Sequence, residues 1–259
     1  MLRSAKELQG FKIGATDGAI GTVDALYFDD VSFTVRHLVV DTGGWLPGKR
    51  VLISPIAVRS VDGAERRIDL NLTKRQIEAS PDISTDPPVS QQVEAEYYRY
   101  YGYAPYWTGP YVWGPVPYPG AVMAPTTPGA FERERRWDWT SSETGDRHLR
   151  SSKEIVDNYT IRATDGDIGH VDDFLVDDES WSIRYMVVDT RNWWPGKRVL
   201  VAPDWIERVE WGDGGVYVDL TREHIKNSPQ YDSSHPLERE YETRLHQHYR
   251  RPGYWHDRA

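Results

Sequence analysis

The chain contains the same sequence pattern twice, and this repeat constrains the fold more than any other feature. Residues 11–81 align without a gap with residues 159–229 at a constant offset of 148 positions, with 31 identities in 71 aligned pairs. The best preserved stretch, residues 41–52, returns as residues 189–200. Such self-similarity indicates a duplicated domain. The chain of 259 residues therefore predicts two small domains of related structure.

Each repeat has the pattern of short strands joined by tight turns. Residues 20–29 alternate apolar with polar or small side chains, as a half-buried strand does. Residues 36–40 form an apolar, β-branched run, and Asp17-Gly18 is a hairpin signal because glycine accepts a positive φ. Thr73 is a good N-cap for a short helix that ends before a proline. The second repeat has equivalents of all these features, so each repeat predicts a small closed barrel of five or six strands.

The spaced motifs of both repeats resemble the PRC-barrel family. The series runs Asp-Gly-x-Ile-Gly-x-Val-Asp at residues 17–24, Val-Val-Asp-Thr at residues 39–42 and Trp-x-Pro-Gly-Lys-Arg-Val-Leu at residues 45–52. The family includes the cytoplasmic domain of the photosynthetic reaction centre H subunit and the C-terminal domain of a 16S rRNA maturation factor. The resemblance implies small β-barrels that serve mainly as protein-interaction modules, without a catalytic site common to the family.

We therefore expect a mainly β protein with two small PRC-type β-barrels in tandem, each followed by a short helix and joined by an aromatic, proline-rich linker. The expected segments are a first barrel at 1–84, a short helix with an aromatic and then charged linker at 85–147, a second barrel at 148–231, and a short helix with an aromatic tail at 232–259.

The linker has an unusual composition. Residues 97–131 contain 8 of the 16 tyrosines and 7 prolines, and the prolines exclude a long helix through most of this stretch. One interpretation is an irregular strap packed on the barrels, which would hide rings that are an aggregation hazard when exposed. The second is a polyproline-like recognition segment that binds a partner through Trp107, Tyr111 and Trp113, and the third is disorder.

A basic pair follows a tryptophan in the best preserved loop of each repeat. The side chains are Lys49, Arg50, Lys197 and Arg198. They are candidates for contacting an anionic group of a partner, and a solvated loop is the alternative. We expect the preceding Trp45 and Trp193 to be mostly buried, because large indole rings usually pack against the domain.

Repeated carboxylates are the main candidates for chemistry. They are Asp24, Asp29, Asp30 and Asp41, which return as Asp172, Asp177, Asp178 and Asp189. Oxygen ligands suit Mg²⁺ or Ca²⁺, but the spacing favours turn formation, since aspartate readily bonds to its own backbone. His246, His248 and His256 form only a loose metal pattern. Ser54 and His37 are replaced by Ala202 and Tyr185, so neither predicts a duplicated catalytic group. The sequence predicts no catalytic residue, metal or cofactor.

Composition and charge further narrow the class of protein that the chain can belong to. The chain has no cysteine, which excludes disulfides, and its net charge of −9 argues against general nucleic-acid binding. Residues 1–7 contain no apolar run and predict no signal peptide, and no 18-residue apolar stretch predicts a transmembrane helix. A cytoplasmic location is the resulting expectation.

These features favour a non-enzymatic protein-interaction or scaffold protein, with a protein partner of unspecified identity and with self-association left open. The alternative is an accessory subunit of a photosynthetic or electron-transfer membrane complex, by analogy with the reaction centre H subunit. Fold analogy alone does not decide between these functions.

Overall fold

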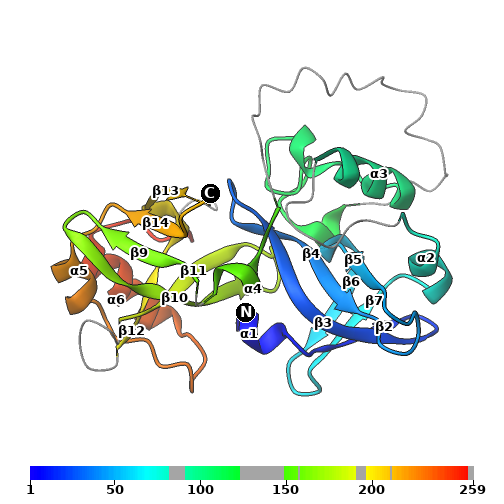
Figure 1. The fold of residues 1–259 in the computed structure, drawn as a ribbon, viewed down its shortest axis with the longest axis horizontal. Coiled ribbons are helices and arrows are strands. Elements are labelled where there is room, and N and C mark those ends of the chain that lie inside the picture. The colour runs from blue at the N-terminus through cyan, green and yellow to red at the C-terminus, as the bar shows by residue number, and fades with distance from the viewer. Residues whose placement is uncertain (82–90, 123–148, 157, 191–196, 211, 256–259) are drawn as a thin grey trace. The chain divides into compact units, whose positions relative to one another are not determined.

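The computed structural model describes residues 1–81, 91–122, 149–156, 158–190, 197–210 and 212–255. The chain divides into two compact units (Figure 1). Unit 1 consists of Met1, Glu7–Ser152 and Asp177–Ser182, and unit 2 consists of Leu2–Lys6, Lys153–Val176 and Ile183–Ala259. Each unit is therefore built from segments that are not contiguous in sequence.

Unit 1 contains a seven-stranded sheet in the order β5-β4-β3-β2-β7-β6, with β8 added beside β3. Strands β2 and β7 pair in parallel, and the other pairs are antiparallel. The strands are β2 (Lys12–Ala15), β3 (Gly18–Asp29), β4 (Thr34–Asp41), β5 (Arg50–Ile53), β6 (Val58–Asp62), β7 (Arg67–Leu70) and β8 (Leu149–Ser151).

Unit 2 repeats this topology in the order β12-β11-β10-β9-β14-β13, with β1 added beside β10. Its strands are β1 (Leu2–Ser4), β9 (Thr160–Ala163), β10 (Gly166–Asp177), β11 (Ile183–Asp189), β12 (Arg198–Val201), β13 (Ile206–Glu210) and β14 (Gly215–Val218). Corresponding strands of the two sheets keep the offset of 148 residues found in the sequence.

Short helices connect and flank the strands. They are α1 (Ala5–Leu8), α2 (Lys74–Glu78), α3 (Gln91–Tyr101), α4 (Ser152–Ile155), α5 (Arg222–Asn227) and α6 (Arg239–Tyr249), with 3₁₀ turns η1 (Pro55–Ala57), η2 (Tyr106–Thr108), η3 (Pro119–Ala121) and η5 (Pro203–Trp205). The offset of 148 also relates α3 to α6, so the repeat includes the helix that follows each sheet.

The predicted mainly β fold is confirmed, with two sheets of seven strands each. The sheets are open in their hydrogen bonding, whereas closed barrels were expected. Among the described strands, none of the pairings joins β5 to β6 or β12 to β13. The 3₁₀ turns η1 and η5 lie between these strands in the sequence, and their backbone takes the chain around the open side.

Local sequence signals explain several of these elements. A Cβ atom at Gly21 would lie 2.0 Å from the carbonyl oxygen of Asp41, and one at Gly169 would lie 2.2 Å from that of Asp189. Both positions therefore require glycine, because the long strand passes so close to the end of its neighbour. Thr73 caps α2 in a capping box with Gln76, as its sequence position predicted.

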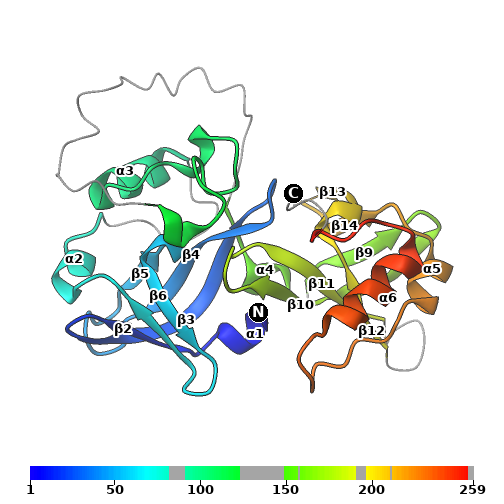
Figure 2. The same ribbon diagram turned by 180° about the vertical axis from the view of Figure 1, so that it is seen from behind.

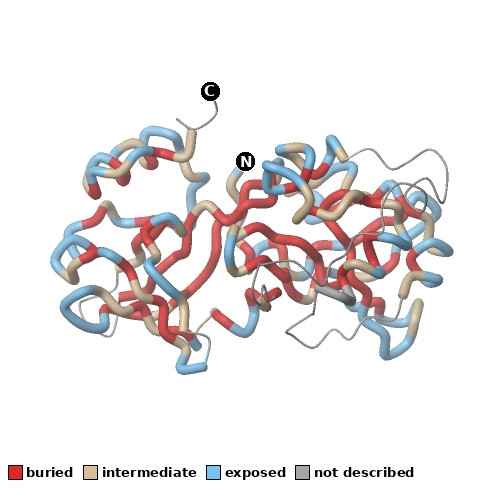
Figure 3. The backbone as a smooth tube through the Cα atoms, turned by 90° about the horizontal axis from the view of Figure 1, so that it is seen from above, coloured by how far each residue is buried: buried red, intermediate tan, exposed pale blue. Residues whose placement is uncertain are grey.

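The cores lie on the long central strands. In β4 all residues from Thr34 to Val40 are buried, and in β11 all but Arg184 are buried. Figure 3 shows buried residues following the strands of each unit and exposed residues gathering at the turns. Helix α3 lies beside β4 and β5 in unit 1, and α6 lies beside α5 in unit 2 (Figure 2).

Candidate interaction surface

A buried glutamate joins α3 to the sheet of unit 1. Glu94 is 3 % exposed, and its Oε1 lies 3.1 Å from Nε2 of His37 in β4. Its Oε2 accepts a hydrogen bond of 3.0 Å from the hydroxyl of Tyr106. The guanidinium of Arg36 lies 3.7 Å from the centroid of the Tyr106 ring. We call Arg36, His37, Glu94 and Tyr106 the first carboxylate cluster.

The same arrangement recurs in unit 2 at positions 148 residues later. Glu242, also 3 % exposed, accepts hydrogen bonds from the hydroxyls of Tyr185 (3.1 Å) and Tyr254 (2.9 Å). The guanidinium of Arg184 lies 4.3 Å from the Tyr254 ring centroid. Burial raises the pKa of Glu242. We call Arg184, Tyr185, Glu242 and Tyr254 the second carboxylate cluster.

Histidine and tyrosine exchange places between the two clusters. In unit 1 the strand supplies His37 and the helix supplies Tyr98, with ring centroids 6.3 Å apart. In unit 2 the strand supplies Tyr185 and the helix supplies His246, with the hydroxyl 2.9 Å from Nε2 of the histidine. The replacement of His37 by Tyr185 thus removes no histidine from the duplicated site, which a position-by-position comparison of the sequences missed.

Both clusters attach the post-sheet helix and its tail to the sheet. In unit 1 the backbone N–H of Ser54 donates to the hydroxyl of Tyr97, which is almost completely buried. In unit 2 burial lowers the pKa of His246, and its Nδ1 lies 2.8 Å from the carbonyl oxygen of Pro252. Because these polar atoms bond to one another beneath the helices, the clusters serve as internal ties between elements.

The aromatic segment of unit 1 is largely packed against the sheet. Trp113 is fully buried, and its indole N–H donates to the carbonyl oxygen of Ser180 at 2.8 Å. Trp107 is half-buried against Tyr98 and Tyr106. Tyr111, in contrast, is 53 % exposed. Of the three predicted anchors, the structure places Tyr111 most openly at the surface.

A reciprocal turn presents Tyr111. The backbone N–H groups of Tyr111 and Gly114 each donate to the other residue's carbonyl oxygen at 3.0 Å. Arg36 Nη1 donates to the carbonyl oxygen of Val112 at 2.5 Å, and Val112 itself is 37 % exposed. We call Tyr111–Gly114 the Tyr111 turn.

The repeated basic pairs have different surroundings. Arg50 and Arg198 form ion pairs with the equivalent Asp24 (3.5 Å) and Asp172 (2.8 Å), so these arginines tie their loops to the long strands. Lys197 donates to the carbonyl oxygens of Lys226 (2.7 Å) and Ser228 at the end of α5, and burial lowers its pKa.

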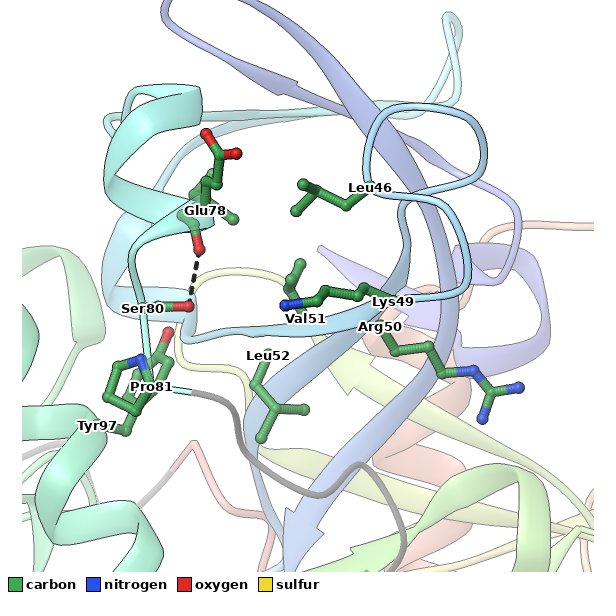
Figure 4. A pocket seen from close by; sticks show the side chains of 10 residues that line it. Leu46, Lys49, Arg50, Val51, Leu52, Glu78, Ser80, Pro81 and Tyr97 are labelled. Atoms are coloured by element: carbon green, nitrogen blue, oxygen red, sulfur yellow. Dashed lines mark hydrogen bonds between the residues drawn. The ribbon is translucent and has the colours of Figure 1, made fainter.

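Lys49 instead lines a pocket of unit 1, and its side chain points toward Ser80, while Arg50 points away (Figure 4). Among the described residues its ammonium makes no ion pair. Trp45 in the same loop is only half-buried, with the Lys74 ammonium 4.9 Å from its ring centroid. Trp193 lies outside the described residues.

The repeated aspartates act mainly in turns and ion pairs. Asp29 accepts from the backbone of Val31 and Ser32 and pairs with Arg36 at 3.1 Å. Burial would raise the pKa of Asp29, but Arg36 and these backbone donors hold it below its ordinary value. Asp41 accepts from the N–H of Gly43.

The histidines near the C-terminus do not converge. Nε2 of His248 lies 2.8 Å from the carbonyl oxygen of His224, whereas His246 faces Tyr185. His256 lies outside the described residues. Within the described ranges, no three metal-binding side chains gather into a cluster. None of the helices described there has the length and apolar character needed to cross a bilayer.

Sequence reasoning missed several residues that organise these surfaces. Glu94 and Glu242 were not singled out, although both fall at the fourth position of the helical segments and keep the offset of 148. Extending the repeat alignment past Pro81 would have paired them, together with Tyr106 and Tyr254.

Comparison with known proteins agrees with the fold. Residues 2–77 match the PRC-barrel domain family. A protein of Deinococcus radiodurans named "Uncharacterized protein" is 45 % identical over 65 residues, which cover 25 % of this chain and 23 % of that protein. The chain therefore spans less than a quarter of the length of this relative. Residues 2–77, which carry the first copy of the duplicated motif series, are therefore similar to PRC-barrel domains.

Proposed function

We propose that the chain is a non-catalytic protein-interaction scaffold and that the Tyr111 turn is a contact surface for its partner. The observation that carries this proposal is an exposed aromatic and aliphatic pair, Tyr111 and Val112, held on a buried base. Tyrosine is a frequent interface anchor, and here it is presented by a turn whose neighbouring residues are fixed.

The base beneath the turn is fixed by its contacts. Arg36 bonds to Val112 from below, and it is itself paired with Asp29 and only 1 % exposed. Trp113 is anchored by its bond to Ser180. A surface held in one conformation loses little entropy on binding, which favours affinity.

A second turn adds apolar surface near the same base. Val31 is 60 % exposed, and its backbone N–H donates to Asp29, the carboxylate that pairs with Arg36. The Tyr111 turn and the turn of Val31 are thus both bonded to the Asp29–Arg36 pair. This arrangement gives a partner more than a single ring to contact.

The polar groups support a binding role rather than catalysis. The histidine and glutamate side chains that the structure brings together are bonded to neighbouring groups in the interior: His37 to Glu94, and Glu242 and His246 to Tyr185. PRC-barrel domains generally serve as interaction modules, which agrees with this use of the ionisable residues. No observation on the described residues favours an accessory subunit of a photosynthetic or electron-transfer complex, and we do not propose it.

Site-specific photocrosslinking tests the proposal. A photoreactive phenylalanine analogue is placed at Tyr111 in the full chain, and at Tyr100, which is 41 % exposed on α3, as the matched control. We expect a discrete crosslinked adduct from position 111 in native lysate and none from position 100. Equal crosslinking at both positions, or none at 111, would contradict the proposal.

Substitution gives a second test on the same surface. The double variant Tyr111→Ala with Val112→Ser should bind the partner identified by crosslinking about tenfold more weakly or worse, as measured in a pull-down without a crosslinker. This is a modest loss for an interface anchor. A melting curve like that of the unsubstituted chain shows that the loss is one of binding. Deletion of residues 97–131 is unsuitable, because it would also remove the buried Trp113 and Tyr106.

A further inference from the structure

Each repeat is preceded by a short segment of nearly the same sequence. N-segment 1 is Leu-Arg-Ser-Ala-Lys-Glu-Leu at residues 2–8, and N-segment 2 is Leu-Arg-Ser-Ser-Lys-Glu-Ile at residues 149–155. Each forms a three-residue strand followed by one helical turn. By sequence pattern alone, either segment could form the added strand of either sheet.

The two segments are placed on opposite repeats. Strand β1 pairs with β10, and β8 pairs with β3, with Ser151 opposite Tyr27 and Leu149 opposite Asp29. The sheet of each unit is thus completed by a strand from the other repeat. The family match begins at residue 2, so β1 belongs by sequence to the first PRC-barrel domain although it is paired with the sheet of the second repeat.

N-segment 2 is held on β3 by bonds from side chains as well as backbone. The backbone N–H of Leu26 donates to Oγ of Ser152 at 3.3 Å in a buried position. Nε of Arg150 lies 3.2 Å from Oδ2 of Asp30. Leu149 is 2 % exposed. Ser152 corresponds to an alanine in N-segment 1, which could not accept the bond.

Unit 2 satisfies the corresponding N–H in another way. The backbone N–H of Phe174, the counterpart of Leu26, donates to Oδ1 of Asp173 at 2.7 Å. Asp173 also accepts from Oγ of Ser4 and, at 3.1 Å, from the N–H of Lys6. Its counterpart in the first repeat is Ala25, which has no acceptor. The β10 edge therefore needs no serine at residue 5, whereas the β3 edge needs Ser152.

We propose that the edge of β3 covered by β8 is a strand-acceptor site selective for N-segment 2, and that a second copy of this chain can supply the same segment in trans. The segment fills the site from its own chain, and a chain whose own segment cannot pair takes residues 148–155 from another copy. Backbone pairing supplies affinity in strand addition, and the buried Leu26 N–H supplies selectivity, because an unpaired buried donor is unfavourable.

Crosslinking in the full chain tests the placement. The chain contains no cysteine, so Asp30→Cys with Arg150→Cys creates a single reactive pair, and Asp30→Cys with Arg3→Cys is the matched control. A short bismaleimide should join residues 30 and 150 in high yield, as read by peptide mass mapping. Crosslinking of residues 30 and 3 with no crosslink between residues 30 and 150 would show that each segment lies on its own repeat and would overturn the proposal.

Peptide addition tests selectivity and supply in trans. The full chain carrying proline at residues 149, 150 and 151 has no backbone N–H to donate from this segment and does not form β8, which vacates the β3 edge. A labelled peptide of residues 148–155 should bind this variant about tenfold more tightly than the same peptide with Ser152→Ala, the ratio expected for one buried hydrogen bond. Equal affinities, or no binding by a variant that remains folded, would overturn the proposal. If this variant is unfolded, a second experiment uses unsubstituted chains, one population of which carries an isotopic label in N-segment 2. The linker is cleaved, and the chains are mixed, partly denatured and refolded at rising concentration. Labelled N-segment 2 should then appear on unlabelled copies, and its absence from them would overturn the proposal.

Discussion

The two carboxylate clusters reach one arrangement with different residues. In unit 1 a histidine on the strand and a tyrosine on the helix flank Glu94, and in unit 2 the tyrosine is on the strand and the histidine on the helix. The glutamate and the tail tyrosine are the same in both. Duplication has therefore preserved a set of mutual contacts while the residues at single positions changed.

Beside the clusters, a larger side chain next to the sheet in one unit is matched by a larger side chain on the helix in the other. Trp205 of η5 packs against His246 and Tyr249, with ring centroids 5.1 and 4.6 Å away. Its counterpart in unit 1 is Ala57, which is fully buried, and there the helix supplies the larger Tyr98 in place of histidine. Cores tolerate such coupled changes when total volume is kept. The difference between the units shows that the helix and the sheet have changed together.

The largest expected difference in stability between the units follows from removing a buried ring from one of them. Trp113→Ala should destabilise unit 1 by about 3–5 kcal/mol, because it leaves a large cavity and frees the carbonyl of Ser180. Hydrogen exchange followed by mass spectrometry reads each unit separately. Tyr111→Ala, an exposed neighbour, is the control and should have little effect. Equal loss of protection in both units would mean that they unfold as one body.

Substituting the central glutamate of each carboxylate cluster tests whether the two clusters stabilise the protein to the same extent. Glu94→Ala and Glu242→Ala should each cost about 3 kcal/mol, since the first leaves His37 and Tyr106, and the second leaves two tyrosine hydroxyls and Arg239, without their acceptor. Denaturant melts of the two variants give the comparison. A loss below about 1 kcal/mol at only one site would show that the two clusters do not contribute alike.

Transplanting one cluster into the other unit tests whether the residues are coupled. Tyr185→His and His246→Tyr should each destabilise unit 2, and the double variant should recover part of the loss because it reproduces the order found in unit 1. We expect a coupling energy of about 1–2 kcal/mol from the double-mutant cycle. Additive losses would mean that the surroundings, rather than the pair, determine which residue fits.

Acid titration should affect the units in opposite directions at two carboxylates. The pKa of Asp29 is lowered in the folded unit 1, so its stabilising contribution is present above its unfolded pKa and is lost as the pH falls through the folded value. Burial raises the pKa of Asp173 in unit 2, so its contribution is greatest at low pH and declines as the pH rises. Hydrogen exchange between pH 5 and 2, a range that extends below the ordinary aspartate pKa, should show Asp29→Asn flattening the profile of unit 1. If the stability of unit 1 fell with pH equally in this variant and in the unsubstituted chain, the acid sensitivity would belong to groups other than Asp29.

The smallest expected effect is at Trp45. Its ring is half-buried under a cation–π contact with Lys74, so Trp45→Ala should cost about 1 kcal/mol, well below the loss for an enclosed tryptophan. Denaturant melts measure it, with Trp45→Phe as the control that keeps a ring. A loss near that of Trp113→Ala would mean that the loop is more tightly packed than its exposure indicates.

Local signals in the sequence predicted much of the fold. The hairpin at Asp17-Gly18, the cap at Thr73 and the long strand ending at Asp29 depend on turn chemistry and period, which a few neighbouring residues determine. The helical segments after each sheet were also predicted. The closed barrel was not observed, because the pattern of single strands does not say whether the first and last strands of a sheet meet.

The pairings that depend on distant residues could not be predicted in this way. N-segment 1 and N-segment 2 have almost the same pattern, so alternation of side chains fits either segment to either sheet. Only the pairing of Ser152 with Leu26, set against Asp173 in the other repeat, distinguishes them. The exchange of His37 and Tyr98 for Tyr185 and His246 is hidden for the same reason, since it is visible only when residues are compared as pairs in space.

The placement of β8 on β3 also affects the order in which the protein can be completed during synthesis. The strands of the first repeat leave the ribosome long before Leu149–Ser151 have been translated, and at typical rates the delay is on the order of ten seconds. During this time Tyr27–Asp29 can pair with β4 but not with β8, and the uncovered edge of the strand can pair with other nascent chains. The sheet of the first repeat is therefore completed only after Leu149–Ser151 have been translated, or by the same segment of another copy, which makes spacing between neighbouring ribosomes on one message a determinant of correct folding.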